Sequence, residues 1–456
     1  MSMKSYERYR DSSLDWVSVV PEHWKVKKLK HVSDVNLSNV DKKSIKGEKE
    51  VLLCNYVDVY YNDVITDAIE FMRATAKYEQ INRFKLKRND VIITKDSESP
   101  TDIAVPTWVS KDFDDVLCGY HLALLRPNDQ INGKYLFYTL QSQAINQQFH
   151  AKANGVTRFA IGKNTIKNAM VLIPPLLEQE KIAKWLDESL SNIDEIVSKK
   201  KQQIEILKQY HQSLITETVT RGLNSDVKMK DSGVEWLGEI PEHWNIKKIK
   251  HFTNHIGSGK TPRGGGEIYV DEGVLFLRSQ NIHKDSLRLD DVVYIPKEID
   301  NKMANSRVKN NDILMNITGA SIGRANVYKL DIPANVSQHV CIIRVKEEKI
   351  SPDYLNYVIA SSYFQSQIMA YQNGASKEGL NFSQISNISF IVPRNIEEQN
   401  SIVDFLNMKI SQIESIRKLM LQQIESFQQY RQSLIYEVVT GKIDVRNYVS
   451  NEQEMT

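Results

Sequence analysis

An internal repeat with a period of 220 residues constrains this chain more than any other feature. A block near the start recurs at that offset: Asp11-Ser12, Trp16, Pro21-Glu22-His23-Trp24, Lys27-Lys28 and Lys30-His31 match Asp231-Ser232, Trp236, Pro241-Glu242-His243-Trp244, Lys247-Lys248 and Lys250-His251. A second block recurs in the same way: Glu178-Gln179, Gln202-Gln203-Ile204-Glu205, Gln209-Tyr210 and Gln212-Ser213-Leu214-Ile215 match Glu398-Gln399, Gln422-Gln423-Ile424-Glu425, Gln429-Tyr430 and Gln432-Ser433-Leu434-Ile435. The chain therefore contains two copies of one structural frame.

Between the repeated blocks the similarity is weak and the offset drifts. Asn89-Asp90 pairs with Asn311-Asp312, and Asn154-Gly155 pairs with Asn373-Gly374. A duplication without functional meaning is the alternative interpretation, but such a duplication should diverge evenly. This chain keeps its frame and varies its inserts, so we expect the two inserts to perform different versions of one task.

The second repeated block predicts two long helices. Residues 178–220 contain neither Pro nor Gly, and apolar or long side chains recur at alternating steps of three and four, as in the seam of a coiled coil. The first seam is Ile182, Leu186, Ile193, Ile196, Leu207, Tyr210 and Leu214, with Ser189, Lys200 and Gln203 as polar steps; the second is Ile402, Leu406, Ile413, Ile416, Met420, Phe427, Tyr430 and Leu434, with Lys409 and Gln423 as polar steps. Pro174-Pro175 and Pro393 precede the helices, and Gly222 and Gly441 follow them. We expect an antiparallel pair; the alternative is that each helix packs on its own domain.

The inserts predict two mixed α/β domains. Runs of β-branched and other apolar residues, bounded by turn residues, predict strands at 51–53, 91–94, 122–125, 274–277, 313–315 and 340–343. One helix is expected in each insert, at 133–149 and 352–369. The fold class is therefore α+β or α/β, with two domains joined by two long antiparallel helices. The expected divisions are an arm and first domain at 1–175, a spacer helix at 176–222, the arm repeat and second domain at 223–394, and a second spacer helix with a tail at 395–456.

Composition says little about binding partners, but it argues against a zinc-binding, disulfide-rich or membrane-spanning protein. The net charge of +2 does not by itself indicate a nucleic-acid partner, because local patches matter more than totals. Cys54, Cys118 and Cys341 lie far apart, so neither a zinc site nor a disulfide framework is expected. No apolar run approaches the ~20 residues that cross a bilayer, and the first residues contain no apolar stretch. We therefore expect a cytoplasmic protein without membrane contact.

Motifs that would indicate catalysis are incomplete. Residues 257–261 resemble the end of a phosphate-binding loop, but Asn254 stands where the pattern requires Gly, and Pro262 follows where a helix should run. His121 and His339 are matched between the copies beside apolar strands, and we interpret them as packed, locally hydrogen-bonded residues. We find no histidine spacing typical of a metal site, no Gly-rich methyl-donor loop and no Asn-Pro-Pro-Tyr-like tetrapeptide. A nuclease with a degenerate acidic site remains a rival interpretation.

The order of the motifs resembles that of type I restriction–modification specificity subunits over nearly the whole chain. Each copy has Pro-Glu-His-Trp with Lys-Lys, a variable α/β domain, an Asn-Gly loop with a small residue and a base, an apolar-Pro step, Glu-Gln, and a long helix ending Gln-Ser-Leu-Ile. In the second copy, residues 259–262 resemble the Gly-x-Thr-Pro turn common early in such domains, whereas the first copy has Asn36-Leu37-Ser38 nearby. The loop that contains this turn should therefore differ between the copies. In the first copy Phe159-Ala160 also stands in place of Glu378-Gly379, a departure that concerns the local loop conformation and not the family.

The resemblance implies a non-catalytic subunit of a methyltransferase and endonuclease complex. Each variable domain would be a target-recognition domain that reads one half of an asymmetric, bipartite site in double-stranded DNA. The implied partners are two modification (methyltransferase) subunits and restriction (helicase-nuclease) subunits. No cofactor and no metal are expected on this chain: S-adenosylmethionine belongs on the methyltransferase, and ATP and magnesium on the restriction subunit. The alternatives are the DNA-recognition part of a different restriction or methylation system and a coiled-coil scaffold without DNA specificity.

Candidate DNA-contacting residues are polar or basic side chains near the predicted loops, because Arg and Lys commonly meet guanine, and Asn and Gln adenine. They are Lys95, Ser97, Lys152, Asn154, Thr157 and Arg158 in the first insert, and Lys260, Thr261, Arg263, Asn316, Arg324, Asn373, Ser376 and Lys377 in the second. The Asn-Gly pairs can equally be turns that only shape a loop.

Overall fold

The chain divides into two compact units in the computed structural model, which describes residues 4–234, 237–262, 264–372 and 379–448. The first unit comprises residues 1–200 together with 422–456, and the second unit comprises residues 201–421. Each unit therefore contains one insert, one copy of the repeated arm and one part of each long helix. The first unit is assembled from both ends of the described chain, whereas the second unit is one continuous segment.

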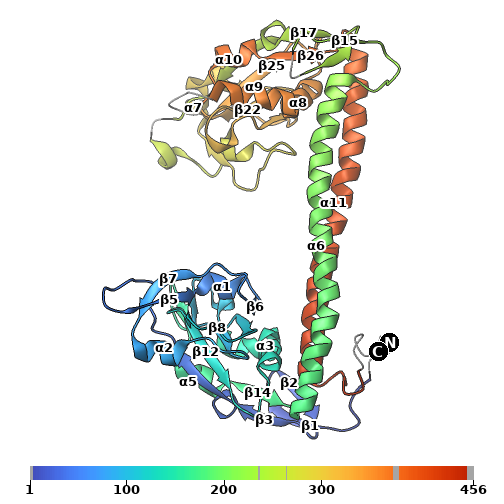
Figure 1. Cartoon of the computed structure of the whole chain (residues 1–456). Helices are drawn as coiled ribbons and strands as arrows, with labels where there is room; N and C mark the ends of the chain where they lie inside the picture. The colour runs from blue at the N-terminus through green and yellow to red at the C-terminus, as the bar shows by residue number, and fades with distance from the viewer. Residues whose placement is uncertain (1–3, 235–236, 263, 373–378, 449–456) are drawn as a thin grey trace. The chain divides into compact units, whose positions relative to one another are not determined.

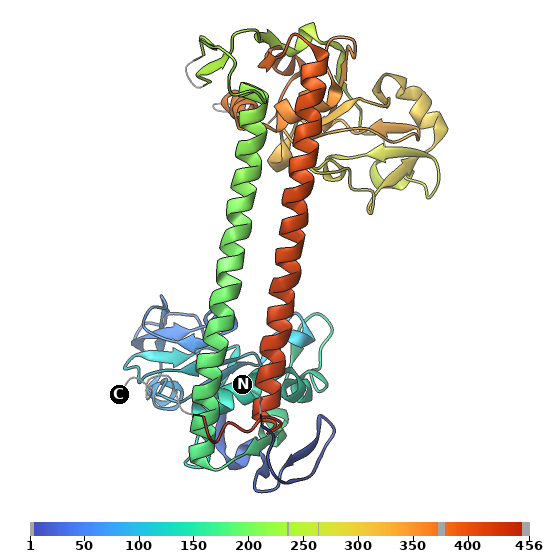
Figure 2. The same ribbon diagram turned by 90° about the vertical axis from the view of Figure 1, so that its right-hand side faces the viewer.

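The two predicted long helices are present as α6 (Leu176–Arg221) and α11 (Ile396–Val439). In the first unit, Ile182 and Leu186 near the start of α6 share a core with Leu434 near the end of α11. In the second unit, Val219 near the end of α6 shares a core with Ile402 near the start of α11. The helices thus run side by side in opposite directions within each unit (Figures 1 and 2), which confirms the antiparallel pairing.

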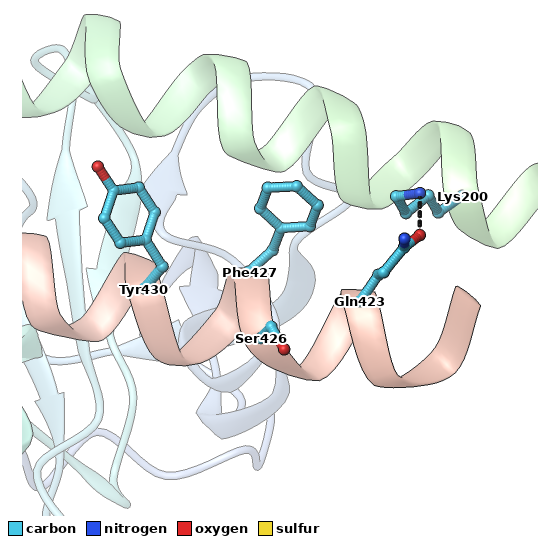
Figure 3. Close-up of a pocket in the computed structure, with 5 residues that line it drawn as sticks. All are labelled: Lys200, Gln423, Ser426, Phe427 and Tyr430. Carbon is cyan, nitrogen blue, oxygen red and sulfur yellow. Dashed lines mark hydrogen bonds between the residues drawn. The ribbon is translucent and has the colours of Figure 1, made fainter. Parts of the chain in front are cut away.

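The seam of the helix pair differs from the prediction in the middle of α6. Ile204 is buried there, whereas the predicted Ile196 and Tyr210 are 39% and 52% exposed. A straight helix has 3.6 residues per turn rather than 3.5, so the buried face drifts away from a strict heptad pattern. Lys200 and Gln423, which were predicted as polar positions of the seam, contact each other: Nζ of Lys200 donates a hydrogen bond to Oε1 of Gln423 at 2.6 Å (Figure 3).

A buried carboxylate joins the repeated motifs in the first unit. Nε1 of Trp24 donates to Oε1 of Glu178 at 2.9 Å, and the Tyr6 hydroxyl donates to the same oxygen at 2.5 Å. Nε2 of His23 lies 2.9 Å from Oε2 of Glu178. The repeated Trp and His of the arm and the repeated Glu of the helix are thus partners in one junction, although 154 residues separate Trp24 from Glu178.

The second unit repeats this junction with fewer contacts. Nε1 of Trp244 donates to Glu398 at 2.9 Å, and Nε2 of His243 lies 3.1 Å from the same carboxylate. The Glu398 side chain is 32% exposed, whereas that of Glu178 is 6% exposed. The first junction is therefore the more deeply buried of the two.

The glutamine of the repeated Glu-Gln pair holds the inserts to the helices. Oε1 of Gln179 accepts a hydrogen bond from the backbone N–H of Asn132 at 2.7 Å, and Oε1 of Gln399 accepts one from the backbone N–H of Ser351 at 2.9 Å. Both glutamines are fully buried. Because a buried amide needs partners for its donor and its acceptor, these two contacts explain why this residue recurs.

Glycine ends each long helix where the arm of the same unit packs against it. Gly222 and Gly441 have φ values of +78° and +74°, a conformation that favours glycine. A Cβ atom on Gly441 would lie 2.4 Å from the Pro21 side chain, and one on Gly222 would lie 3.1 Å from the Trp244 ring. The predicted helix ends are thus fixed both by backbone conformation and by close packing.

The two inserts share one strand order and differ in detail. In the first unit, one sheet runs β4-β12-β8-β10-β6 and another runs β11-β5-β7; in the second unit the sheets run β18-β25-β22-β23 and β20-β19-β24-β21. The strands of the first insert are β4 (Ser33–Leu37), β5 (Lys49–Cys54), β6 (Val64–Ile65), β7 (Met72–Ala76), β8 (Val91–Thr94), β9 (Asp96–Ser97), β10 (Pro106–Val109), β11 (Val116–Cys118), β12 (Leu122–Pro127) and β13 (Phe159–Ala160). Those of the second are β18 (Thr253–Ser258), β19 (Val274–Leu277), β20 (Val293–Ile295), β21 (Arg307–Val308), β22 (Ile313–Asn316), β23 (Ala325–Val327), β24 (Ala334–Val336) and β25 (Val340–Val345).

Short strand pairs form the repeated arms. The arm strands are β1 (Tyr9–Leu14), β2 (Val17–Pro21) and β3 (Lys25–Lys28) with β14 (Met170–Ile173) in the first unit, and β15 (Met229–Asp231), β16 (Glu239–Pro241) and β17 (Asn245–Lys248) with β26 (Ser389–Val392) in the second. β3 pairs with β14 and β17 pairs with β26, both antiparallel. One strand of each arm thus pairs with the strand that precedes a long helix.

Both faces of the central strands are buried, which explains their continuous apolar sequence. In β8, Val91 and Ile93 belong to the core shared with the long helices, whereas Ile92 belongs to the core between the two sheets. In β22 of the second unit, Ile313 and Leu314 divide in the same way. The predicted strands in these runs are all present because such runs are typical of strands covered on both sides.

The single helix predicted in each insert is two helices. α3 (Gly133–Gln141) is followed by α4 (Gln143–His150), and α8 (Pro352–Ala360) is followed by α9 (Ser362–Gln372). Ser142 and Ser361 are extended and separate the helices. The amide of Asn146 donates to the Leu140 carbonyl at the end of α3, so the break is held by a side chain from the next helix.

The remaining helices are short: α1 (Tyr56–Tyr60), α2 (Tyr78–Phe84), α5 (Lys163–Asn168), α7 (Lys297–Lys302) and α10 (Phe382–Asn387).

The matched Asn-Asp pairs of the inserts form turns. Asn89 and Asn311 have φ near +70°, and each following Asp accepts bonds from an arginine of the central strand, Arg126 and Arg344 respectively. This part of the repeat is therefore structural.

Candidate functional site

Two loops of the first insert that carry predicted residues meet in the structure. β9 pairs with β13, with Ser97 opposite Phe159 and Asp96 opposite Ala160. This short ladder places the loop that contains Arg158 beside the end of the central strand β8. Residues about 60 positions apart in the sequence thus form one surface.

A hollow of about 470 Å³ lies at this surface in the first unit. Its lining combines tyrosines with charged and polar side chains: Lys42, Tyr56, Val57, Tyr60, Tyr61, Asp96, Ser97, Glu98, Asp102, His121 and Arg158. We call this the tyrosine–arginine pocket. Two of the predicted residues, Ser97 and Arg158, belong to it.

Asp96 organises the polar side of the tyrosine–arginine pocket. Nε and Nη2 of Arg158 donate to Oδ1 of Asp96 at 3.0 and 2.6 Å, and Nδ1 of His121 lies 2.8 Å from the same oxygen. The Asp96 side chain is 11% exposed, whereas that of Arg158 is 54% exposed. The carboxylate is thus buried beneath a guanidinium that it holds in one orientation.

Tyrosines form the aromatic part of the pocket lining. The rings of Tyr56 and Tyr60 stack with centroids 5.5 Å apart, and Tyr61 meets Tyr60 edge to face at 5.1 Å. The Tyr56 hydroxyl donates to Oγ of Ser97 at 3.2 Å. Burial raises the pKa of Tyr56 and of Tyr60 above the usual range, so both hydroxyls stay protonated and remain hydrogen-bond donors.

The other candidates of the first insert lie around the pocket. Nζ of Lys95 donates to the Ser38 carbonyl at 3.0 Å and lies 4.3 Å from the centre of the Tyr120 ring, and burial lowers its pKa. Lys152, Asn154 and Thr157 are exposed on the loop before Arg158. Lys95 therefore already has partners within the first unit, whereas the loop residues face solvent.

The candidates of the second insert are more scattered. Lys260 and Thr261 are exposed, and Arg324 is half-buried. Asn316 is fully buried, and its amide donates to the Ser279 carbonyl at 2.8 Å, which leaves its side chain out of reach of a surface ligand. The candidates outside the described residues are Arg263, Asn373, Ser376 and Lys377.

The second unit has a counterpart of the Asp96–His121 pair in which a hydroxyl replaces the carboxylate. Oγ1 of Thr318 lies 2.8 Å from Nδ1 of His339, and Thr318 bridges to Gly379 as β9 pairs with β13. The matched histidines are therefore locally hydrogen-bonded in both units, as expected from the sequence. They differ in the partner, which is a carboxylate in the first unit and a hydroxyl in the second.

Sequence reasoning missed Asp96 and the three tyrosines. The run Tyr56-Val57-Asp58-Val59-Tyr60-Tyr61 was a usable signal, because it gathers three side chains that each combine an apolar ring with a hydroxyl that needs a hydrogen-bond partner when buried. Asp96 carried no comparable signal. Its partners are 25 and 62 residues away, and only the strand pairing brings them together.

The phosphate-loop resemblance has a structural explanation. Gly259 follows strand β18, and a Cβ atom there would lie 1.5 Å from the Val336 carbonyl oxygen, so close packing requires glycine. No helix of eight or more residues follows within the described part of this loop.

Among the described residues there is no group of three or more His, Cys, Asp or Glu side chains placed to hold a metal ion. None of the described helices is long and apolar enough to span a membrane.

Comparison with known families gives two matches on this chain. The type I restriction modification DNA specificity domain matches residues 21–206 and again residues 241–426. The chain belongs to this family. The second match begins 220 residues after the first, which is the offset of the sequence repeat. Each matched region spans an insert and the adjoining part of a long helix, so the family's domain includes the repeated frame as well as the variable part.

Relatives in this family resemble the chain over most of its length. The MjaVIII specificity subunit of Methanocaldococcus jannaschii is 25% identical over 439 residues, which cover 94% of this chain and 95% of the relative. The EcoBI specificity subunit of Escherichia coli is 26% identical over 325 residues, which cover 69% of this chain and 66% of the relative. Both relatives carry the name of type I restriction enzyme specificity subunits.

Solved structures share the fold. A chain from a study of the assembly and conformational transition of the type I R-M system superposes with a TM-score of 0.70 at 14% identity, covering 93% of this chain and 99% of that chain. The HsdS subunit from Thermoanaerobacter tengcongensis superposes with a TM-score of 0.50 at 16% identity, covering 93% of this chain and 98% of that one. The expected fold class of two α/β domains with two long helices is thereby confirmed.

Proposed function

We propose that this specificity-subunit family member reads an asymmetric, bipartite site in double-stranded DNA for a type I restriction–modification complex. The observation that carries the proposal is the double family match on two units with the same strand order and different loop chemistry. A carboxylate, a histidine and an arginine meet in the first unit, and the described residues at the matching place in the second unit are a threonine and a histidine. Two readers with different chemistry read two different half-sites.

The same proposal assigns the catalytic steps to partner subunits. In it, two methyltransferase subunits supply S-adenosylmethionine chemistry, restriction subunits supply ATP- and magnesium-dependent chemistry, and this chain supplies sequence recognition without catalysis. Its DNA substrate implies that the complex acts in the cytoplasm.

The surface of the long helices supports partner docking. In the second unit, Ile206, Tyr210 and Leu419 are 62%, 52% and 59% exposed. In the first unit, Phe427 and Tyr430 line a pocket of about 370 Å³ between α6 and α11, beside the Lys200–Gln423 hydrogen bond (Figure 3). Apolar side chains that stay exposed on a helix pair are typical of a surface that another subunit covers.

Co-expression with a candidate methyltransferase partner of the same restriction–modification system tests the proposal. We expect a complex with two methyltransferase copies per chain that methylates one bipartite sequence, whereas the chain alone binds no S-adenosylmethionine and transfers no methyl group. Exchange of residues 20–175 for those of a relative should change one half-site and leave the other intact. A chain that never associates with the methyltransferase, or a complex whose two half-sites both change, would contradict the proposal.

A further inference from the structure

The tyrosine–arginine pocket offers one group of hydrogen-bond donors with a fixed direction. Nε and Nη2 of Arg158 are taken by Asp96, while Nη1 has no hydrogen-bond partner among the described residues. The guanidinium therefore directs its Nη1 end, with two N–H groups, away from the buried carboxylate. Its side chain is half exposed, so a ligand at the protein surface can reach it.

Guanine is the base that suits such a donor. In the major groove it presents two neighbouring acceptors, N7 and O6, and arginine is their commonest protein partner. A free arginine side chain must lose rotamer freedom to make this contact, which costs affinity. At Arg158 much of that freedom is already lost in the folded unit, because two hydrogen bonds to Asp96 hold the guanidinium before DNA arrives.

We infer that Arg158, oriented by Asp96, reads one guanine in the half-site of the first unit. Arg158 is the specificity-determining residue, since it touches the base, and Asp96 is a positioning residue, since it acts through Arg158. The inference rests on the proposed function and names the reading group and the base that it recognises.

Among the described residues of the second unit, the position of Asp96 is taken by a residue that cannot orient an arginine in the same way. Thr318 is neutral where Asp96 is charged, and a hydroxyl cannot hold a guanidinium through two charge-assisted bonds. We therefore assign the guanine contact to the first half-site. This difference gives the asymmetry of the proposed site a residue-level cause.

Site mapping with the methyltransferase complex tests the inference. For Arg158→Ala we expect one guanine position of the first half-site to lose about 10- to 100-fold of its discrimination while the second half-site is unchanged. Asp96→Asn should relax the same position, because the orientation of Arg158 weakens although its charge remains. Arg88→Ala is the matched control, since Arg88 is exposed in the same unit outside the pocket and its removal deletes the same charge.

Modified DNA tests the inference with the wild-type complex, so the test does not depend on whether a variant assembles. Replacement of single guanines by 7-deazaguanine removes the N7 acceptor, and at one position of the first half-site this should weaken binding by the wild-type complex about tenfold. Arg158→Ala should be insensitive to that replacement. If no guanine of the first half-site responds, or if Arg158→Ala methylates the unchanged sequence, the inference is overturned while the proposed function stands. If the wild-type complex methylates no defined sequence, the proposed function itself fails.

Discussion

Removal of the buried carboxylate at the first junction should destabilise the arm of the first unit far more than the matching change in the second. Glu178 accepts hydrogen bonds from Trp24 and Tyr6, which are 1% and 4% exposed, and contacts His23. Each buried donor left without a partner costs about 1–3 kcal/mol, so Glu178→Ala should cost about 3–5 kcal/mol locally. At Glu398, where the carboxylate is partly exposed and one donor fewer is bound, the cost should be about 1–2 kcal/mol.

Hydrogen exchange measured by mass spectrometry on the full chain separates the two effects, because it reports local opening of each arm. A single unfolding free energy would be ill-defined for a chain of two units. A difference of about 2 kcal/mol corresponds to about 30-fold faster exchange in β1–β2 of Glu178→Ala than in β15–β16 of Glu398→Ala. Glu178→Gln, which keeps the shape and one acceptor oxygen, should fall between the wild type and Glu178→Ala. Equal acceleration in both arms, or none in the first, would refute the reasoning.

Three further outcomes follow from the structure. Gly441→Ala should destabilise the first unit locally by about 3 kcal/mol, because its φ is positive and the Cβ atom would lie 2.4 Å from a proline side chain. Gly47→Ala, with positive φ in open space, should cost about 1 kcal/mol, and equal acceleration of local hydrogen exchange in the two variants would contradict the clash. Burial lowers the pKa of His211, so the folded second unit disfavours the protonated side chain and should lose stability as pH falls below about 6.5, the pKa in the unfolded chain. His211→Gln should make that loss smaller in hydrogen exchange measured as a function of pH. An unchanged pH dependence would contradict the role given to His211. Paired four-residue insertions at 199–203 and 419–423, which preserve the pairing of α6 with α11, should lengthen the unread gap of the methylated site; a gap that stays fixed would exclude the helices as the spacer.

The frame could be predicted from the sequence because its residues are repeated and its helices are long. The repeated Pro-Glu-His-Trp and the glycines after the long helices marked real structural positions, whereas Trp236 lies outside the described residues. What the sequence could not indicate was which repeated residues meet. The Trp24–Glu178 contact spans 154 residues and depends on the arm packing against the start of α6. The break at Ser142 was missed for a similar reason, since its neighbours are good helix formers and the break is held by the side chain of Asn146.

The candidate site could be predicted only in part. Arg158 and Ser97 were found because they are polar residues in loops, and both lie in the tyrosine–arginine pocket. Asn316 was selected on the same ground, yet it is fully buried, because the end of a central strand is covered by a loop whose path the sequence does not reveal. Loop chemistry indicates which residues are able to bind, but tertiary pairing decides which of them reach a ligand.

The discontinuity of the first unit has a consequence for synthesis of the chain. Ile182 and Leu186 share a core with Leu434 and Val445, so the first unit cannot complete its packing until the ribosome has made the last part of the described chain. At ~5–20 residues per second, the interval between residues 200 and 445 is roughly ten to fifty seconds. The second unit is continuous and is finished earlier. The apolar face at the start of α6 is therefore without its α11 partner during this interval, and it needs protection from aggregation on the nascent chain.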